Sequence, residues 1–263
     1  ILPHNDDIEE FEEFVKDIKN YGFDAVLVAD LGLFDMMQEL APEIPIHVST
    51  QANNINYRSA IKWYKMGATR VVLAREMSFK EIAEFQKKIP EDLELEAFIH
   101  GAMCISYSGR CLLSNYMTGR DSNMGACAHP CRWNYKLVEE TRPGEYMDVF
   151  ENERGTFIFN SKDLCTIRHI PELVQSGIAS LKIEGRVKTS YYVATVVGAY
   201  RREIDRYCAD PENYVFNEAE YEELCKVSHR PYTTGFYFGK PDENSQVYTS
   251  SSYIRDYDLI GIV

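Results

Sequence analysis

The sequence predicts an α/β fold in which a largely parallel β-sheet is covered by helices. Apolar stretches of about five residues alternate with segments of about ten to thirteen residues at helical spacing, which is the pattern of successive β/α units. Polar residues follow the apolar stretches where the strands would end, as they do in TIM-type barrels. Five stretches have the character of barrel strands, whereas a complete (β/α)8 barrel has eight.

The first half of the chain supplies four of these strands. Residues 1–7 resemble the end of a strand and a helix entry, and Asp6 or Asp7 can cap a helix whose apolar residues are Ile8, Phe11, Phe14, Val15 and Ile18. Strands are predicted at 25–28, 46–49, 70–73 and 93–99, with helices at 34–40, 57–66 and 78–89.

The second half departs from this alternation after Cys131. Residues 135–140 and 156–159 are predicted strands around an acidic turn at 142–153, which indicates a hairpin. Ser161 to Asp163 is predicted to cap a helix that reaches Ser176, and a strand follows at 180–183. A long helix at 189–207 is expected to bury Tyr192, Val193, Val196, Val197 and Tyr200. Residues 218–227 are a predicted short helix, 229–252 a loop and 257–263 an apolar strand.

Composition indicates a globular protein with an acidic balance. The 263 residues are 45% hydrophobic, and the formal net charge is -13. No long apolar run and no secretory leader are visible, so we expect a cytoplasmic protein without a membrane span. The net charge argues against indiscriminate nucleic-acid binding, but it does not exclude a local basic face. Its candidates are Arg110, Arg120, Arg132, Arg186, Lys188, Arg201, Arg202 and Arg230, and the alternative is that these are scattered surface charges and ion-pair partners.

Four of the seven cysteines, Cys104, Cys111, Cys127 and Cys131, lie in one stretch rich in glycine and arginine. Such a stretch is expected to be loop-like and to be held by something other than an apolar core. Disulfides are disfavoured by the odd cysteine count and the missing leader. Zinc sites show closer cysteine pairs, whereas an iron–sulfur cluster tolerates irregular spacing. Spacing by itself leaves zinc and iron–sulfur open.

Polar residues at the predicted strand ends are the candidate site. They are Asp30, Gln51, Arg75, Glu76, His100, Glu184 and Arg186. Arg75, Arg186 and Arg132 would suit a substrate carboxylate, because a guanidinium binds a carboxylate through two parallel hydrogen bonds. The alternative is that Arg75 with Glu76, and Glu184 with Arg186, only brace the edge of the sheet as ion pairs. His129 is expected in a surface loop, and Cys208 and Cys225 as buried apolar residues on helices.

Several motifs give the chain a resemblance to a known family. They are Glu96-x-Phe98-x-His100-Gly101-x-x-Cys104, Ser108-Gly109-Arg110-Cys111, Ser114-Asn115-Tyr116, Gly119-Arg120, Cys127-x-x-Pro130-Cys131-Arg132, Ser161-Lys162-Asp163-Leu164-Cys165, Lys182-x-Glu184-Gly185-Arg186 and Ser228-His229-Arg230-Pro231-Tyr232-Thr233-Thr234-Gly235. Together they resemble the collagenase-like peptidase family U32, and within it the branch that hydroxylates RNA.

The resemblance implies a partial TIM-type (β/α)8 barrel that lacks its first units and runs into the start of a C-terminal β domain. On this basis we expect a partial barrel over 1–208, with a Cys-rich loop and hairpin insertion at 101–160, and a helical and loop extension over 209–263. The resemblance also implies a [4Fe-4S] cluster on Cys104, Cys111, Cys127 and Cys165, with Cys131 in reserve.

For function, the resemblance implies prephenate-dependent hydroxylation of the wobble uridine of tRNA to 5-hydroxyuridine. The expected catalytic residues are Arg75, Glu76, His100, Glu184 and Arg186, and the expected partners are tRNA, a small carboxylate co-substrate and a second copy of the chain. Two alternatives stay open: the peptidase activity in the family name, although neither His-Glu-x-x-His nor Gly-x-Ser-x-Gly occurs, and an accessory role in a hydroxylation complex.

Overall fold

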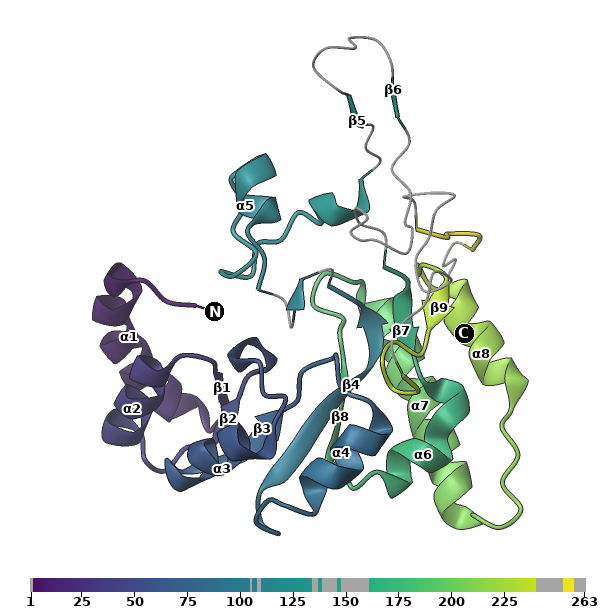
Figure 1. Cartoon of the computed structure of the whole chain (residues 1–263), viewed down its shortest axis with the longest axis horizontal. Helices are drawn as coiled ribbons and strands as arrows, with labels where there is room; N and C mark the ends of the chain where they lie inside the picture. The colour runs from purple at the N-terminus through teal and green to yellow at the C-terminus, as the bar shows by residue number, and fades with distance from the viewer. Residues whose placement is uncertain are drawn as a thin grey trace.

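The computed structural model describes residues 2–104, 106–107, 110–133, 137–138, 146–147, 161–239 and 253–257. Its centre is a mostly parallel sheet (Figure 1). The strands β1 (Val26–Val28), β2 (Ile46–Val48), β3 (Ala68–Val72), β4 (Glu94–Ala102) and β8 (Ser180–Ile183) pair in this order, all parallel. The five predicted strands and the α/β class are therefore confirmed, while closure into a partial barrel stays a prediction.

Helices follow the parallel strands, and side-chain caps fix where several of them start. They are α1 (Asn5–Ile18), α2 (Leu31–Leu40), α3 (Tyr57–Lys65), α4 (Phe79–Gln86), α5 (Leu113–Thr118), α6 (Ile170–Gln175), α7 (Ser190–Ala209) and α8 (Glu218–Lys226). Ser78 caps α4 as predicted, with Glu81 completing a capping box. Asp30 caps α2 by accepting hydrogen bonds from the Gly32 and Leu33 amides, so it serves the helix and not the site.

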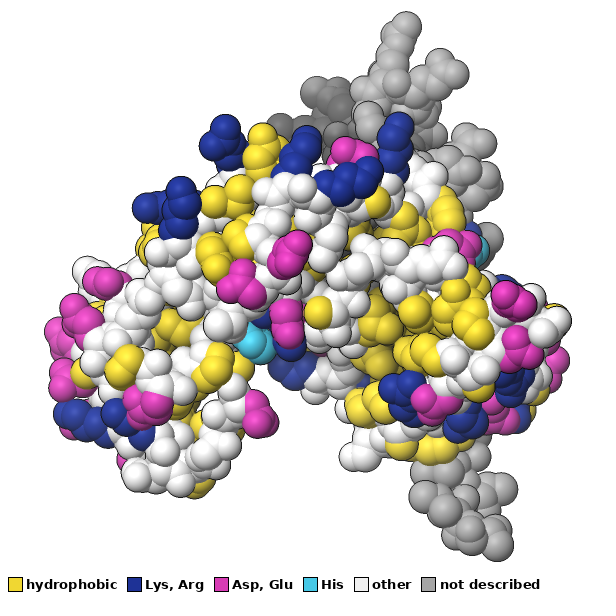
Figure 2. Space-filling view, turned by 90° about the horizontal axis from the view of Figure 1, so that it is seen from below, with side chains coloured by type: hydrophobic (Ala, Val, Ile, Leu, Met, Phe, Trp, Pro, Cys, Tyr) yellow, Lys and Arg dark blue, Asp and Glu magenta, His cyan; other side chains and the backbone are white. Residues whose placement is uncertain are grey.

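Two apolar cores lie on either side of β4. One packs α1 to α4 against β1 to β4, and the other joins α6, α7 and α8 to the strand β7 (Asp163–Cys165). Seen from below, the molecule has two lobes with a hollow between them, and a histidine and charged side chains meet at the head of this hollow (Figure 2). No helix among the described residues is long and apolar enough to cross a membrane.

The predicted helix from Ser161 to Ser176 is partly wrong. Residues 163–165 form β7, which pairs antiparallel with the end of β4 and parallel with β9 (Tyr232–Thr233). Only residues 170–175 of that segment are α-helical, as α6. The predicted loop at 229–252 is also wrong at β9. Both errors have one cause: β7 and β9 form by pairing with distant segments, which local patterns do not reveal.

Smaller differences concern the surface and the termini. Val193 and Val197 are 38% and 47% exposed, against the prediction, whereas Tyr192, Val196 and Tyr200 are buried. Cys208 is exposed on α7 rather than buried, because it faces away from the second core. Residues 2–4 form no strand, and α1 is capped by a box of His4 and Asp7 rather than by an aspartate at the cap position.

Within the described residues, the predicted hairpin is represented by one pair of short strands. Its first strand is β5 (Leu137–Val138), and the partner is β6 (Tyr146–Met147), which lies inside the segment predicted as a turn. The predicted strand at 156–159 lies outside the described residues, as does most of the predicted strand at 257–263.

A bulge near the end of β4 decides which way its side chains point. Phe98 is paired with Lys182, but the next pair is His100 with Ile183, so β4 contains one extra residue. An extra residue re-aims the side chains beyond it. Glu94, Glu96 and Phe98 share one face of the sheet, whereas His100 turns toward the second core.

Candidate functional site

A cavity of about 490 Å³ opens where the parallel strands end. We call it the cysteine cavity, because its lining includes Cys104, Cys111, Cys127 and Cys131 together with Arg75, Glu184 and Arg186. The lining residues come from the segments after β2, β3, β4 and β8 and from the cysteine-rich stretch. The structure thus brings these strand-end residues and the clustered cysteines to one cavity, while their roles stay predictions.

Arg75 is the most enclosed charged residue of this cavity. Its side chain is 10% exposed, and one guanidinium nitrogen lies 3.7 Å from a Glu184 carboxylate oxygen. The guanidinium carbon lies 3.8 Å from the centre of the Phe98 ring, a cation–π contact that fixes the plane of the group. Burial lowers the pKa of Arg75, and the charge of Glu184 opposes this effect. An arginine remains charged under such conditions, so the cavity holds a positioned cation.

Two glycines let the elements around the cavity approach closely. Gly101 has φ +110°, and a Cβ there would lie 2.4 Å from the backbone oxygen of Glu184. Gly125 has φ +83°, and a Cβ there would lie 3.0 Å from a guanidinium nitrogen of Arg186. The first contact joins β4 to the segment after β8, and the second brings the cysteine-rich stretch onto Arg186.

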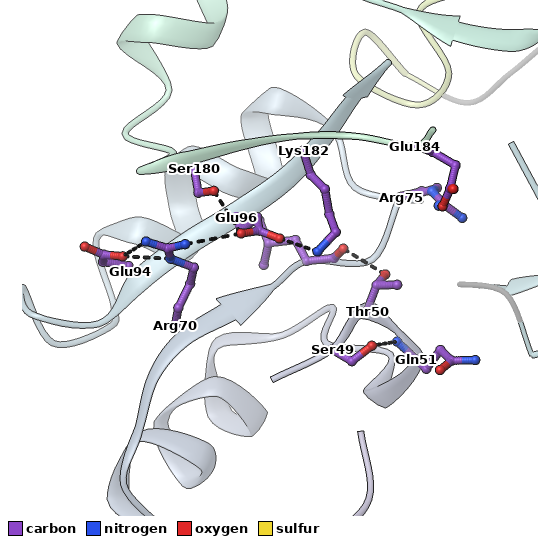
Figure 3. A network of polar contacts seen from close by, with 11 residues as sticks. Ser49, Thr50, Gln51, Arg70, Arg75, Glu94, Glu96, Ser180, Lys182 and Glu184 are labelled. Carbon is purple, nitrogen blue, oxygen red and sulfur yellow. Dashed lines mark hydrogen bonds and ion pairs between the residues drawn. The ribbon is translucent and has the colours of Figure 1, made fainter. Parts of the chain in front are cut away.

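A row of polar side chains crosses the same face of β3, β4 and β8 (Figure 3). Glu96 is its centre: its carboxylate accepts hydrogen bonds from Lys182 Nζ at 2.6 Å and Ser180 Oγ at 2.8 Å. Arg70 lies on its other side, with Nη1 at 3.4 Å from Glu96 and Nε at 2.7 Å from Glu94. Burial would raise the pKa of Glu96, but Lys182 and the other partners outweigh it and lower the pKa. Lys182 also lines the cysteine cavity, so this network fixes a second cation there.

The cysteine sulfurs share a local hydrogen-bond pattern. The Leu113 amide donates to Cys111 Sγ at 3.4 Å, and the His129 amide donates to Cys127 Sγ at 3.3 Å. The backbone of Ser106 bonds in the same way to Cys104, and that of Ile167 to Cys165. In each case the donor is two residues beyond the cysteine. Backbone amides directed at sulfur favour the thiolate, which is the form that ligates metals.

The donor set around the cavity fits an iron–sulfur cluster in its chemistry. Such clusters take thiolate ligands, and four thiols line this cavity. Burial raises the pKa of Cys104, whereas the nearby charge of Arg75 lowers it. Within the described ranges, no three histidine, cysteine or acidic side chains lie close enough to hold a metal ion. The thiols therefore surround a common space without forming a closed site.

Cys165 and His100 lie apart from this cavity. They are paired across β7 and β4, and both face the second core beyond the bulge. Cys165 Sγ lies 4.0 Å from Tyr200 Oη, and burial raises the pKa of this thiol to about 11. His100 is 1% exposed, with Nδ1 at 3.4 Å from the same hydroxyl. Burial, followed by the charges of Lys188 and His229, lowers the pKa of His100 to about 3, so its ring is neutral.

The remaining predicted residues divide between several places. Gln51 lines the cysteine cavity, and its carbonyl accepts a hydrogen bond from Arg110 Nε at 2.8 Å. Glu76 lines a different, larger cavity, although it directly follows Arg75. His129 lines the cysteine cavity with a left-handed backbone (φ 56°), a conformation that is uncommon outside glycine and asparagine. Cys225 is half-buried on α8.

The predicted basic face is reduced to a few residues. Arg201 and Arg202 form ion pairs with Asp205 and Glu220, and Arg230 is fully buried. These three arginines are therefore structural charges and ion-pair partners, and they do not form a basic face. Arg110, Arg120 and Arg186 remain exposed around the cysteine-rich stretch.

Sequence reasoning missed Lys182, Glu96 and Phe98 as parts of the site. One signal was available: Lys182 precedes Glu184 by two residues, and alternate residues of a strand share a face. The roles of Glu96 and Phe98 had no such signal, because they depend on pairing across three strands.

The fold and this cavity define an α/β protein with a cysteine-rich strand-end site, and comparison with known proteins defines its family. The chain belongs to peptidase family U32, whose model matches residues 1–247. No solved structure matches the chain.

Three relatives illustrate the similarity. The chain is 43% identical over 263 residues to tRNA hydroxylation protein P1 of Bacillus subtilis (strain 168), which covers 100% of this chain and 62% of that protein. It is 39% identical over 295 residues to tRNA hydroxylation protein P of Escherichia coli (strain K12), and the match covers 97% of this chain and 64% of that protein. An uncharacterised protease of Methanocaldococcus jannaschii is 42% identical to the chain over 246 residues, and the match covers 92% of this chain and 58% of that protein. The chain thus spans less than two thirds of the length of these relatives.

Proposed function

We propose that this protein hydroxylates RNA, with the wobble uridine of tRNA as its target and 5-hydroxyuridine as its product. The names of the B. subtilis and E. coli relatives support RNA hydroxylation as the general activity. The observation that carries the proposal in this chain is the meeting of four thiols and two arginines around one cavity. A cysteine peptidase needs one thiol with its own base, whereas crowded thiols suit shared metal ligation.

The proposed cofactor is a [4Fe-4S] cluster on Cys104, Cys111, Cys127 and Cys165, with Cys131 in reserve. When bound, such a cluster supplies electron transfer or a substrate-binding iron. The chain's own contribution is to present thiolates: the backbone amides described above stabilise each of the four sulfurs, and Arg75 lies near Cys104. Cys165 must move from the second core to join the other three, whereas Cys131 already lines the cavity.

The proposed hydroxyl donor is prephenate, which carries two carboxylates. Arg75 and Arg186 are the residues that would bind them, and Lys182 adds a third positive charge to the lining. Glu184 would orient Arg75, since the two groups are 3.7 Å apart. Glu76 and His100 stay predictions as catalytic groups, because neither lines this cavity.

The activity is tested by analysing tRNA nucleosides from a strain that lacks the gene. We expect 5-hydroxyuridine derivatives to disappear in mass spectrometry and to return with the wild-type gene but not with Cys104→Ser. Unchanged nucleosides would refute tRNA hydroxylation. Cleavage of gelatin or labelled peptides by the purified protein, abolished by Cys104→Ser, would instead establish the peptidase.

The ligand set is tested by iron and sulfide content after purification without oxygen. We expect Cys165→Ser to lose iron and Cys131→Ser to keep it, with the exposed Cys208→Ser as a matched control. The reverse result would replace Cys165 by Cys131 in the cluster. A cytoplasmic location and self-association belong to the same proposal and remain predictions.

A further inference from the structure

A second and larger cavity, of about 1010 Å³, has no role in the function proposed so far. We call it the lysine cavity, because Lys80, Lys88 and Lys162 line it. Met103 and Cys104 line both cavities, so the segment after β4 is a wall of each. A molecule held in the lysine cavity therefore lies beside Cys104 without occupying the cysteine cavity.

The inner surface of the lysine cavity is apolar and aromatic. Met77, Phe85 and Met103 are 4%, 4% and 8% exposed and form part of the lining. Tyr57 and Tyr107 also line it, and Tyr107 is 47% exposed. Solvent-accessible aromatic rings beside an apolar floor can stack on a planar heterocycle.

The lysines of this cavity can contact an anion. The lining also contains three glutamates, Glu76, Glu81 and Glu84. Two of them have local partners: Glu81 accepts hydrogen bonds from the Ser78 amide and hydroxyl, at 2.8 and 2.7 Å, and Glu84 is 2.8 Å from Lys87. Among the described residues, none of the ion pairs involves Lys80, Lys88 or Lys162. The Lys88 ammonium lies 5.0 Å from the centre of the Tyr57 ring, which holds it at the wall.

We propose that the lysine cavity binds the RNA nucleotide that is to be modified, with its base among the aromatic residues and its phosphates on the lysines. The inference rests on the proposed RNA function and extends it, by assigning RNA and the small carboxylate to separate cavities that share Cys104. Enzymes that act on a base take it out of the stack into a pocket, and a cavity of this volume accommodates a nucleotide. Glu76 then lies beside the base, since it lines this cavity.

The experiment measures binding of the full-length protein, purified without oxygen, to a fluorescent RNA hairpin with a uridine in its loop. For Tyr107→Ala we expect the Kd to rise about tenfold, because a stacked base contributes that much. For the double variant Lys80→Ala, Lys88→Ala we expect a similar rise in Kd. The slope of log K against log salt concentration should also be smaller by about 1.4, since each phosphate contact to a single strand contributes about 0.7 to that slope. Lys16→Ala, an exposed lysine on α1, is the matched control and should leave the Kd unchanged.

A second measurement does not depend on the variants folding. A hairpin with 4-thiouridine in the loop is photo-crosslinked to the wild-type protein, and the peptides are mapped by mass spectrometry. Crosslinks to peptides with Tyr57 or Tyr107 are expected, and crosslinks confined to other peptides would overturn the assignment.

The outcomes separate this inference from the proposed function. If the wild type binds RNA but both cavity variants stay within twofold of its Kd, the lysine cavity is not the nucleotide site and RNA hydroxylation still stands. If the wild type binds no RNA, the proposed function itself fails. A loss of affinity that Lys16→Ala shares would indicate general electrostatic attraction and would also overturn the assignment.

Discussion

Arg75 shows how a single residue is prepared for anion binding. Its side chain is largely buried, its plane is fixed by Phe98, and Glu184 lies near it at 3.7 Å, beyond ordinary hydrogen-bond distance. A guanidinium held in this way loses little conformational entropy when it binds a carboxylate, and it can form two parallel hydrogen bonds. A lysine at this position would keep the charge and lose both properties.

Arg75→Lys should therefore weaken binding of a dicarboxylate such as prephenate about tenfold, because the variant loses one charge-assisted hydrogen bond. Isothermal titration calorimetry measures this effect. Arg201→Lys, on the outer face of α7, is the control and should bind normally. An unchanged Kd for Arg75→Lys would place the carboxylate elsewhere.

Glu96 makes the stability of the polar row depend on pH. Lys182 and the neighbouring donors lower the pKa of Glu96 in the folded state. The stability that Glu96 contributes is therefore fully present above the ordinary pKa of a carboxyl, and it is lost as pH falls through the folded-state pKa. Glu96→Gln removes the charge that Lys182 and Arg70 share. We expect about 2 kcal/mol lower unfolding free energy at pH 7, the scale of a hydrogen bond to a charged group.

Urea unfolding from pH 3 to pH 7 checks this expectation. The difference in unfolding free energy between wild type and Glu96→Gln should shrink as pH falls, because the carboxyl is protonated first in the unfolded state and at lower pH in the folded state as well. Glu12→Gln, in an exposed pair with Lys16, should change the free energy of unfolding by less than about 0.5 kcal/mol. A difference independent of pH would mean that Glu96 acts by packing and not by charge.

Among the elements, β4 is the one that connects the cavity to both cores. Its first part pairs with β3 and β8, and its end pairs with β7. Strand β4 can have these partners because of the bulge near His100 and the positive φ of Gly101. The close approach of Gly101 to Glu184 sets the distance between the ends of β4 and β8.

Gly101→Ala should lower the unfolding free energy by about 3 kcal/mol, because it adds both backbone strain and a clash with the Glu184 carbonyl. Gly198→Ala is the matched change inside α7, where the nearest atom is the end of the flexible Arg202 side chain. That variant should gain up to about 1 kcal/mol from helix propensity. Thermal unfolding of the two proteins gives the comparison, and equal stabilities would show that Gly101 is not constrained.

At the scale of the whole molecule, the cysteine-rich stretch lies outside both apolar cores. None of the described residues in 104–133 belongs to either cluster of buried apolar residues. Its observed attachments are hydrogen bonds, such as those from Arg110 to Gln51 and from Leu2 to Asn123. A bound metal centre would supply much of the stability of this stretch, since a ligand stabilises the state that binds it.

Removal of the proposed iron–sulfur cluster with a chelator should therefore open this stretch and leave the sheet intact. Trypsin is expected to cleave after Arg110, Arg120 or Arg132 at least ten times faster in the iron-free protein. Cleavage after Arg206, within α7, should stay slow in both forms and serves as the internal control. Mass spectrometry of the fragments checks this, and equal rates at all sites would mean that the stretch is held without metal.

The chain's own pattern determined the α/β class, the five parallel strands, the cap of α4 and the gathering of Arg75, Glu184 and the clustered cysteines. These features follow from local periodicity, capping residues and the rule that parallel strands end at one edge. Only the tertiary structure decided the pairing of β7, the direction of His100 and Cys165, and the split of Arg75 and Glu76 between two cavities. Each of these depends on contacts between segments far apart in the sequence, and a single bulge in β4 reverses the face on which a side chain lies.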